Sequence, residues 1–152
     1  MVVRVLGIDY GGRRIGLALS DASATLASPW RTIERPASER ATVDLLVSEI
    51  DSLIASDDGL QAIVLGWPRK LDGSPTHQTA GVEALKRVLE TRVSIAVVLQ
   101  DERLSSHEAE SRLARREADW RKRKAKLDAA AAAVVLQDYL DSRARPADES
   151  PA

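Results

Sequence analysis

The sequence contains no cysteine and no long apolar run. Without cysteine, disulfide scaffolds, zinc–thiolate sites, iron–sulfur clusters and thiol nucleophiles are excluded. The longest unbroken apolar run, Ala129–Leu136, is too short to cross a bilayer, and the start Met1–Leu6 lacks the architecture of a signal peptide. We therefore expect a soluble, cytoplasmic protein with no membrane partner.

The length and composition are those of a single globular domain. The chain has 152 residues, of which 44% are hydrophobic and 30% charged. A chain of this length buries about 70% of its surface on folding. We expect one domain over residues 1–143. Residues 144–152, which are rich in proline, alanine and acidic side chains, are expected to form a disordered tail.

The first part of the chain predicts three strands that pair with their sequence neighbours. Val2–Ile8 is a β-branched, mostly apolar run that is typical of a buried strand, and Gly11-Gly12 ends it. Ile15–Ser20 is expected to return as the second strand of a hairpin. The third extended segment, Leu26–Glu34, contains Pro29, which favours an edge strand.

The rest of the chain alternates helices with short buried strands. A helix at 3.6-residue spacing is expected over residues 43–54, with Ser38 as its N-cap. Ala62–Leu65 and Val93–Leu99 predict two further strands, and Ser74-Pro75 predicts the start of a helix that runs to about Thr91.

Two further helices are expected after the last strand. Ser105–Glu108 fits a capping box, and a final helix is predicted from about Lys126 to Ser142. Its alanines, Ala129–Ala133, allow close approach to a sheet. The whole pattern predicts an α/β fold with a mixed five-stranded sheet, in which three antiparallel strands are followed by parallel βαβ units, flanked by helices.

Carboxylates follow two of the predicted buried strands, and a third lies in the last helix. Asp9 directly follows the first strand, where open α/β sheets place ligands, although it also fits a residue that merely caps a turn. Asp101-Glu102 follows the last strand, so either residue is a candidate to face Asp9, the alternative being solvated loop charges. Asp128 precedes the alanine run, where it is also favourable simply as a charge near a helix N-terminus.

Three carboxylates from two strand ends and a helix would form an oxygen-rich cage. Such a cage suits a hard divalent cation, Mg²⁺ or Mn²⁺. Two such ions activate water and stabilise the leaving oxygen in phosphodiester cleavage. No other set of residues in the sequence offers a comparable site.

A basic stretch lies between Glu102 and Asp128. Residues 112–126 contain eight basic and two acidic side chains, although the net charge of the whole chain is only −1. Such a stretch is usually a solvated helix face, but its position beside the expected cage favours contact with nucleic acid. The candidate contacts here are Arg116, Trp120, Arg121, Lys122, Arg123, Lys124 and Lys126, and Arg69 and Lys70 are candidates to extend the same surface.

Four motifs in order resemble the YqgF/RuvX family of Holliday-junction-resolvase-like proteins, also called pre-16S rRNA nucleases. Gly7–Asp21 resembles the opening G-x-D-x-G-x-x-R-x-G-x-A-x-S-D of that family. Gly66-Trp67-Pro68 with Asp72-Gly73-Ser74 resembles its G-x-P and D-G-S segment, and Asp101–Ser106 its D-E-R-[LF]-[ST]-[ST] segment. Asp128–Leu140 resembles its closing helix, so the match spans about Val2 to Asp141.

The resemblance implies a ribonuclease H-like fold and a Mg²⁺- or Mn²⁺-dependent nuclease. It carries the catalytic and metal-binding roles onto Asp9, Glu102 and Asp128, and it puts Arg14 near the scissile phosphate. The implied substrate is structured RNA, with trimming of the 5′ end of the small-subunit rRNA precursor. Arg69-Lys70 replaces residues that are often uncharged in the family, and the fourth carboxylate of true junction resolvases has no clear counterpart here.

Other functions remain open from the sequence. Within the enzyme class, the alternative is a DNA endonuclease that resolves branched junctions, which would normally require a symmetric dimer. The chain is expected to be a monomer or a homodimer. The G-x-D-x-G opening is shared with actin-like and sugar-kinase ATPases, but those need two such domains. A non-catalytic RNA-binding factor in ribosome assembly is the remaining alternative.

Overall fold

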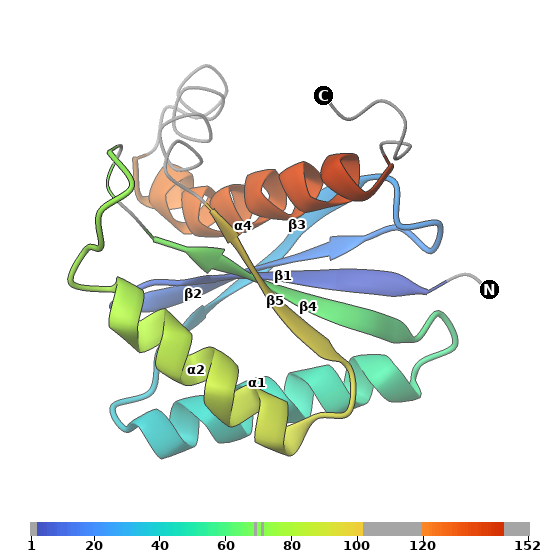
Figure 1. Ribbon diagram of the computed structural model, residues 1–152, viewed down its shortest axis with the longest axis horizontal. Coiled ribbons are helices and arrows are strands. Elements are labelled where there is room, and N and C mark those ends of the chain that lie inside the picture. Colours follow the sequence, from blue (N-terminus) through green and yellow to red (C-terminus); the bar gives the residue numbers. More distant parts are fainter. Residues whose placement is uncertain (1–2, 69, 71, 102–119, 145–152) are drawn as a thin grey trace.

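The computed structural model describes residues 3–68, 70, 72–101 and 120–144, without the side chains of residues 120–127 and 144. Three consecutive strands are followed by alternating helices and strands, as the sequence predicts (Figure 1). In chain order the elements are β1 (Arg4–Tyr10), β2 (Arg14–Ser20), β3 (Ala27–Glu34), α1 (Glu39–Ala55), β4 (Leu60–Trp67), α2 (Thr79–Arg92), β5 (Ala96–Asp101) and α4 (Trp120–Ala144).

The strands form one mixed sheet in the order β3-β2-β1-β4-β5. β1 pairs antiparallel with β2 and β2 antiparallel with β3, whereas β4 pairs parallel with both β1 and β5. The predicted five-stranded mixed sheet is therefore confirmed. β3 is an edge strand, as Pro29 indicates, and its ladder with β2 skips Trp30 next to that proline.

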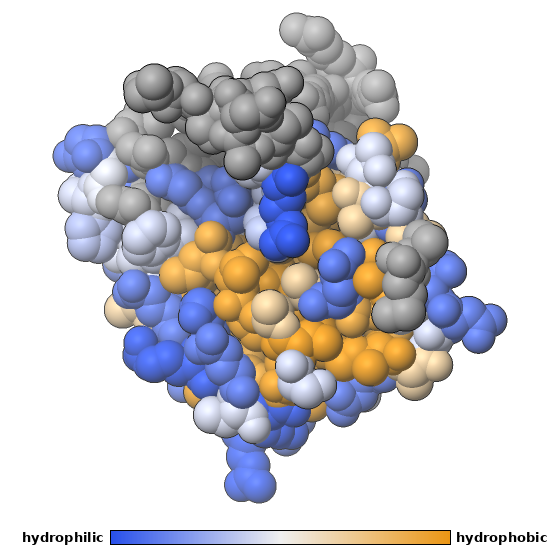
Figure 2. Space-filling view, turned by 45° about the vertical axis from the view of Figure 1, so that its right-hand side comes forward, coloured by the Kyte–Doolittle hydropathy of each residue, from blue (hydrophilic) through white to orange (hydrophobic). Residues whose placement is uncertain are grey.

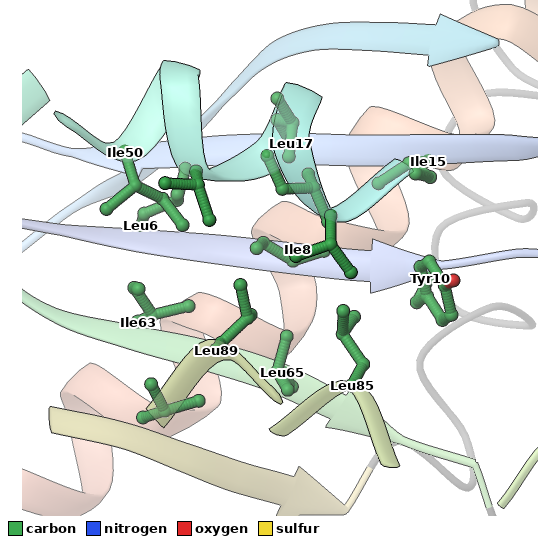
Figure 3. Packing of buried hydrophobic residues seen from close by; sticks show 14 of the residues in the cluster. Leu6, Ile8, Tyr10, Ile15, Leu17, Ile50, Ile63, Leu65, Leu85 and Leu89 are labelled. Carbon is green, nitrogen blue, oxygen red and sulfur yellow. The ribbon is translucent and has the colours of Figure 1, made fainter. Parts of the chain in front are cut away.

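Helices cover the two faces of the sheet, with α1 and α2 on one side and α4 on the other (Figure 1). Because side chains alternate along a strand, the sheet contributes side chains to two hydrophobic cores, one on each face. Leu6, Ile8 and Tyr10 of β1 belong to the core cluster that includes residues of α1 and α2 (Figure 3). Val5 of β1 belongs to the cluster that includes residues of α4. Odd-numbered positions of β1 thus face α4.

The α4 helix lies against small residues of the sheet. A Cβ atom added to Gly7 would come 2.9 Å from Cβ of Leu136 and 3.0 Å from the carbonyl oxygen of Ala132. Ala129 and Ala132 are both buried. The predicted close approach of the alanine run to the sheet is confirmed. In the described ranges, every helix is too short or too polar to cross a bilayer.

At the other edge of the sheet, β5 contributes apolar side chains to the surface. Ala96 is exposed and Val98 and Leu99 are only half-buried. A space-filling view shows a continuous apolar area with hydrophilic residues to its left and below it (Figure 2).

Several element boundaries differ from those expected. Ser38 does cap α1, since its side chain accepts a hydrogen bond from the backbone N–H of Ala41. The prediction that Ser74-Pro75 opens a helix is wrong, because α2 begins at Thr79. The side chain of Ser74 instead bonds within its own turn, where its hydroxyl donates to the Asp72 carboxylate at 2.6 Å.

The last helix is longer than predicted. α4 begins at Trp120 rather than near Lys126 and ends at Ala144, one residue into the expected tail. The other tail residues, 145–152, and the predicted capping box Ser105–Glu108 lie outside the described residues.

Candidate active site

Asp9 lies near the carboxyl end of β1 on the face that α4 covers. Its position has the same parity as Val5 and Gly7, whose neighbours come from α4. It pairs across the β1–β2 ladder with Gly16, and it is half-buried. Strand β1 continues through Tyr10, which packs in the core formed with α1 and α2. Its neighbour Asp9 therefore faces the opposite side of the sheet.

Asp128, a residue of α4, lies against the same part of the sheet. A Cβ atom on Gly16 would overlap the backbone carbonyl of Asp128, so only glycine at this position lets the helix lie so close to β2. Since Gly16 pairs with Asp9, the backbone of Asp128 lies next to the strand pair that carries Asp9. The structure therefore places the backbones of two of the three predicted ligands, Asp9 and Asp128, at the same pair of strands.

Arg14 is the first residue of β2 and lies on the same face as Gly16 and Ala18. Its Nε atom is 2.9 Å from Oδ2 of Asp128, and the two side chains are only 30% and 28% exposed. This partial burial reduces the screening of the ion pair by solvent. The guanidinium of Arg14 thus forms an ion pair with Asp128, which is a candidate metal ligand.

The turn between β1 and β2 is held by hydrogen bonds that the sequence did not reveal. The N–H of Gly11 donates to the carbonyl of Arg14 at 3.1 Å. The Arg35 side chain donates to the carbonyl of Gly11 at 3.1 Å, and the Arg35 N–H donates to the carbonyl of Arg13 at 2.8 Å. Arg35, just after β3, therefore ties the hairpin next to Asp9 to its neighbouring strand.

Arg35 also covers the ring of Tyr10, with its guanidinium carbon 4.1 Å from the ring centroid. Burial raises the pKa of the Tyr10 hydroxyl, an effect that the positive charge of Arg35 partly opposes. Arg35 has no motif around it in the sequence. Its role depends on β3 ending beside the β1–β2 turn, which local patterns do not indicate.

Asp101, the last residue of β5, pairs with Trp67 of β4. Alternation along β5 gives it the parity of Val97, which packs in the core cluster with α1 and α2. Asp9 has the opposite parity with respect to the sheet. The sequence left open whether Asp101 or Glu102 faces Asp9. The alternation along β5 turns Asp101 away from Asp9. Glu102 lies outside the described residues.

The nucleic-acid-binding candidates are described only in part. Lys70 is exposed in the turn after β4, at the end of the sheet where the parallel strand β1 also ends. Its backbone N–H donates to the carbonyl of Ser74 at 2.8 Å. Arg69 and Arg116 lie outside the described residues. The backbone of α4 includes the other candidates, without their side chains: Trp120, Arg121, Lys122, Arg123, Lys124 and Lys126.

The donor set at this site fits a hard divalent cation as far as it is described. Asp9 and Asp128 supply carboxylate oxygens, which Mg²⁺ and Mn²⁺ prefer. Within the described ranges there is no group of three or more acidic, histidine or cysteine side chains close enough to hold a metal ion.

Sequence comparisons find a family that covers nearly the whole chain. A family model described as "RuvX: Holliday junction resolvase" matches residues 3–142. A protein of Maridesulfovibrio salexigens is 39% identical over 138 residues, which span 91% of this chain and 98% of that protein. One of Bacillus subtilis is 36% identical over 140 residues, which span 92% of this chain and 99% of that protein. Both are named "Putative pre-16S rRNA nuclease".

Solved structures of junction resolvases share the fold. The RuvC protein of T. thermophilus in complex with a Holliday junction substrate superposes with a TM-score of 0.52 at 14% identity, covering 93% of this chain and 95% of that one. The yeast mitochondrial Holliday junction resolvase Ydc2 gives a TM-score of 0.51 at 14% identity, covering 91% and 78%. At such low identity the likeness concerns the fold alone, and the expected ribonuclease H-like fold is confirmed.

Proposed function

The chain belongs to the RuvX family, and on that premise we propose that it is a metal-dependent nuclease that trims the 5′ end of the 16S rRNA precursor by phosphodiester hydrolysis. Relatives that match over nearly their full length are named "Putative pre-16S rRNA nuclease". The proposal includes a cytoplasmic location, where the precursor would be met.

One observation of the structure supports this function above the others. Asp9 and Asp128, far apart along the chain, lie on one face of the sheet beside Gly16, with Arg14 on the Asp128 carboxylate. Carboxylate oxygens are the ligands that Mg²⁺ and Mn²⁺ prefer, and a guanidinium matches the geometry of a phosphate. A site that binds a cation and then a phosphate accounts for this arrangement.

In this mechanism the chain's residues divide into two groups. Asp9, Asp128 and Glu102 hold Mg²⁺ or Mn²⁺. A divalent ion bound there supplies activation of water and stabilisation of the leaving oxygen. Arg14 holds the scissile phosphate. Lys70 and the basic residues at the start of α4 hold the flanking phosphates without reading the base sequence.

A junction-cleaving DNA endonuclease is the second candidate. It is favoured by the family model that matches residues 3–142, which is described as a Holliday junction resolvase. Two symmetric cuts require two active sites related by a two-fold axis, so this activity needs a homodimer. Light scattering of the purified protein, with and without a four-way DNA junction, tests that requirement.

The test of the proposed function is a cleavage panel. Purified protein is incubated with Mn²⁺ or Mg²⁺ and a precursor-rRNA fragment, a four-way DNA junction or unstructured single strands. We expect cleavage of the rRNA fragment, loss of that cleavage in EDTA, and a decrease of at least about a hundredfold in Asp9→Asn, because one ligand of the cation is weakened.

Asp51→Asn is the matched control, since Asp51 is an exposed aspartate of α1 on the other side of the sheet. It removes the same charge and is expected to cleave like the wild type. Equal cleavage by Asp9→Asn and the wild type would contradict the proposed site. Retained RNA binding with no cleavage of any substrate by the wild type would instead favour a non-catalytic RNA-binding factor.

A further inference from the structure

The ion pair between Arg14 and Asp128 occupies the carboxylate on which the proposed function depends. Arg14 Nε lies 2.9 Å from Oδ2 of Asp128, and that oxygen is buried. A guanidinium at this distance from a half-buried carboxylate supplies the positive charge that stabilises the ionised form of that carboxylate. Arg14 thus takes the electrostatic place of a cation.

The two partners of this ion pair differ in their freedom to move. Asp128 belongs to α4, whose backbone packs against Gly16 at this residue, so the backbone of Asp128 is fixed by the contact between the helix and β2, and its short side chain has little reach. Arg14 is attached next to the β1–β2 turn, and its long side chain can reorient toward solvent without disturbing the sheet. When the pair separates, Arg14 is therefore the partner that moves.

A divalent cation and a guanidinium repel each other, and here both are attracted by the same carboxylate. Each must therefore weaken the binding of the other to Asp128. A free guanidinium presents a fork of N–H donors that matches a phosphate, which can draw Arg14 away from Asp128. Coupling of this kind is reciprocal, so phosphate held by Arg14 would strengthen cation binding.

We propose that Arg14 is a built-in substitute for the catalytic cation, which neutralises Asp128 and keeps cation affinity low until a nucleic-acid phosphate draws its guanidinium away. This inference rests on the proposed function, because it assigns a regulatory role within the same site. It predicts that removing the guanidinium strengthens cation binding and weakens catalysis. If Arg14 merely oriented Asp128, removing the guanidinium would lower both the cation affinity and the rate of catalysis.

The test measures Mn²⁺ binding without nucleic acid, by calorimetry or by the electron paramagnetic resonance signal of free Mn²⁺. We expect Arg14→Gln to lower the Kd for Mn²⁺ at least tenfold relative to the wild type. Arg13→Gln is the matched control, since Arg13 is the exposed neighbour in the turn and removes the same charge. The Kd of Arg13→Gln for Mn²⁺ is expected to stay within about twofold of the wild-type value, because Arg13 is exposed and solvent screens its charge.

A measurement on the wild-type protein makes the test independent of how well the variant folds. The Nε–H resonance of Arg14, assigned by comparison with Arg14→Lys, is followed by NMR during a Mg²⁺ titration. We expect it to shift as the ion pair opens, whereas the resonance of Arg13 stays in place. In parallel, the kcat/KM of Arg14→Gln on the precursor fragment is expected to fall although its cation affinity rises.

Unchanged or weaker Mn²⁺ binding in Arg14→Gln, an unresponsive Arg14 resonance, or the absence of saturable Mn²⁺ binding in all variants would overturn the inference. If the Mn²⁺ affinities follow the expected order but no variant or wild-type preparation cleaves rRNA, the proposed function fails and the role of Arg14 stands. The binding and cleavage measurements thus separate the two proposals.

Discussion

At the scale of the residue, Gly16 of β2 faces α4 where the carbonyl oxygen of Asp128 lies. No side chain fits between them, and the same residue pairs with Asp9 across the hairpin. One glycine therefore lets the helix lie against the sheet and also sets how near the backbone of Asp128 comes to the strand pair that carries Asp9. Any side chain here has to push α4, and Asp128 with it, away from β1.

We expect Gly16→Ala to reduce the free energy of unfolding by about 1–3 kcal/mol, as overpacking of a tight contact does. Its cleavage rate should fall further than stability alone explains, by about a hundredfold, because a displacement near 1 Å is enough to misalign a catalytic group. Urea denaturation and the precursor-rRNA cleavage assay check the two parts.

Gly81→Ala is the control for this prediction. Gly81 lies in α2, where an added Cβ would have nothing within 4 Å. Alanine there is expected to leave cleavage unchanged and to stabilise the helix by about 1 kcal/mol. Full activity in Gly16→Ala would show that the position of Asp128 does not limit catalysis.

At the scale of the element, Gln137 joins α4 to the beginning of β3. Its Oε1 accepts a hydrogen bond from the N–H of Ala27 at 2.9 Å, and its Nε2 donates to the carbonyl of Thr25 at 3.0 Å. Nε2 also donates to the carboxylate of Asp141 at 3.0 Å. One side chain thereby satisfies two backbone groups at the edge of the sheet.

Gln137→Ala leaves those backbone groups without this partner, and we expect the free energy of unfolding to fall by about 1–3 kcal/mol. Cleavage should persist below the denaturation range, because the contact of α4 with Gly16 is unchanged. The midpoint of urea denaturation measures the loss. Gln78→Ala, which changes an exposed side chain before α2, should leave that midpoint unchanged.

The elements also show where sequence patterns mislead. Ser74-Pro75 looks like a helix start, but α2 begins only at Thr79. The hydroxyl of Thr79 donates to the carbonyl of Pro68, the residue after β4, and the hydroxyl of Ser74 donates to the carboxylate of Asp72. The helix begins where it can pack against the strand, which is a tertiary contact that a capping motif does not contain.

At the scale of the whole molecule, acid stability depends in part on the β2–β3 connection. The Asp21 carboxylate accepts hydrogen bonds from the Ser23 hydroxyl and from the N–H groups of Leu26 and Thr25. Chiefly through the Ser23 bond, these lower the pKa of Asp21 from 3.8 to about 2. The unfolded chain therefore binds this proton more readily than the folded protein does.

Because the pKa is lowered on folding, the contribution of Asp21 to stability is fully present above pH 3.8 and is lost as the pH falls through about 2. We expect Asp21→Asn to be less stable than the wild type at pH 5, with a gap that narrows as the pH approaches 2. Denaturation curves at several pH values test this. Asp51→Asn controls for the loss of one exposed charge, and a gap independent of pH would contradict the prediction.

The sequence by itself determined the order of the strands and helices, the glycine turn after β1, the Ser38 cap and the edge position of β3. These features follow from local periodicity and from residues whose backbone preferences act within a few positions. It also singled out Asp9, which lies near the carboxyl end of β1, where open α/β sheets place ligands. Asp128 was singled out too, but its expected position near a helix N-terminus is wrong, because α4 begins at Trp120 and Asp128 lies inside the helix.

Only the tertiary structure decided which groups meet. The contact of Gly16 with Asp128, the pairing of that aspartate with Arg14, and the Arg35 side chain over Tyr10 all join residues from different elements. The strand direction that turns Asp101 away from Asp9 depends on the register of β5 beside β4. Such contacts depend on how elements pack, and packing is set by the shapes of surfaces that are assembled from distant parts of the chain.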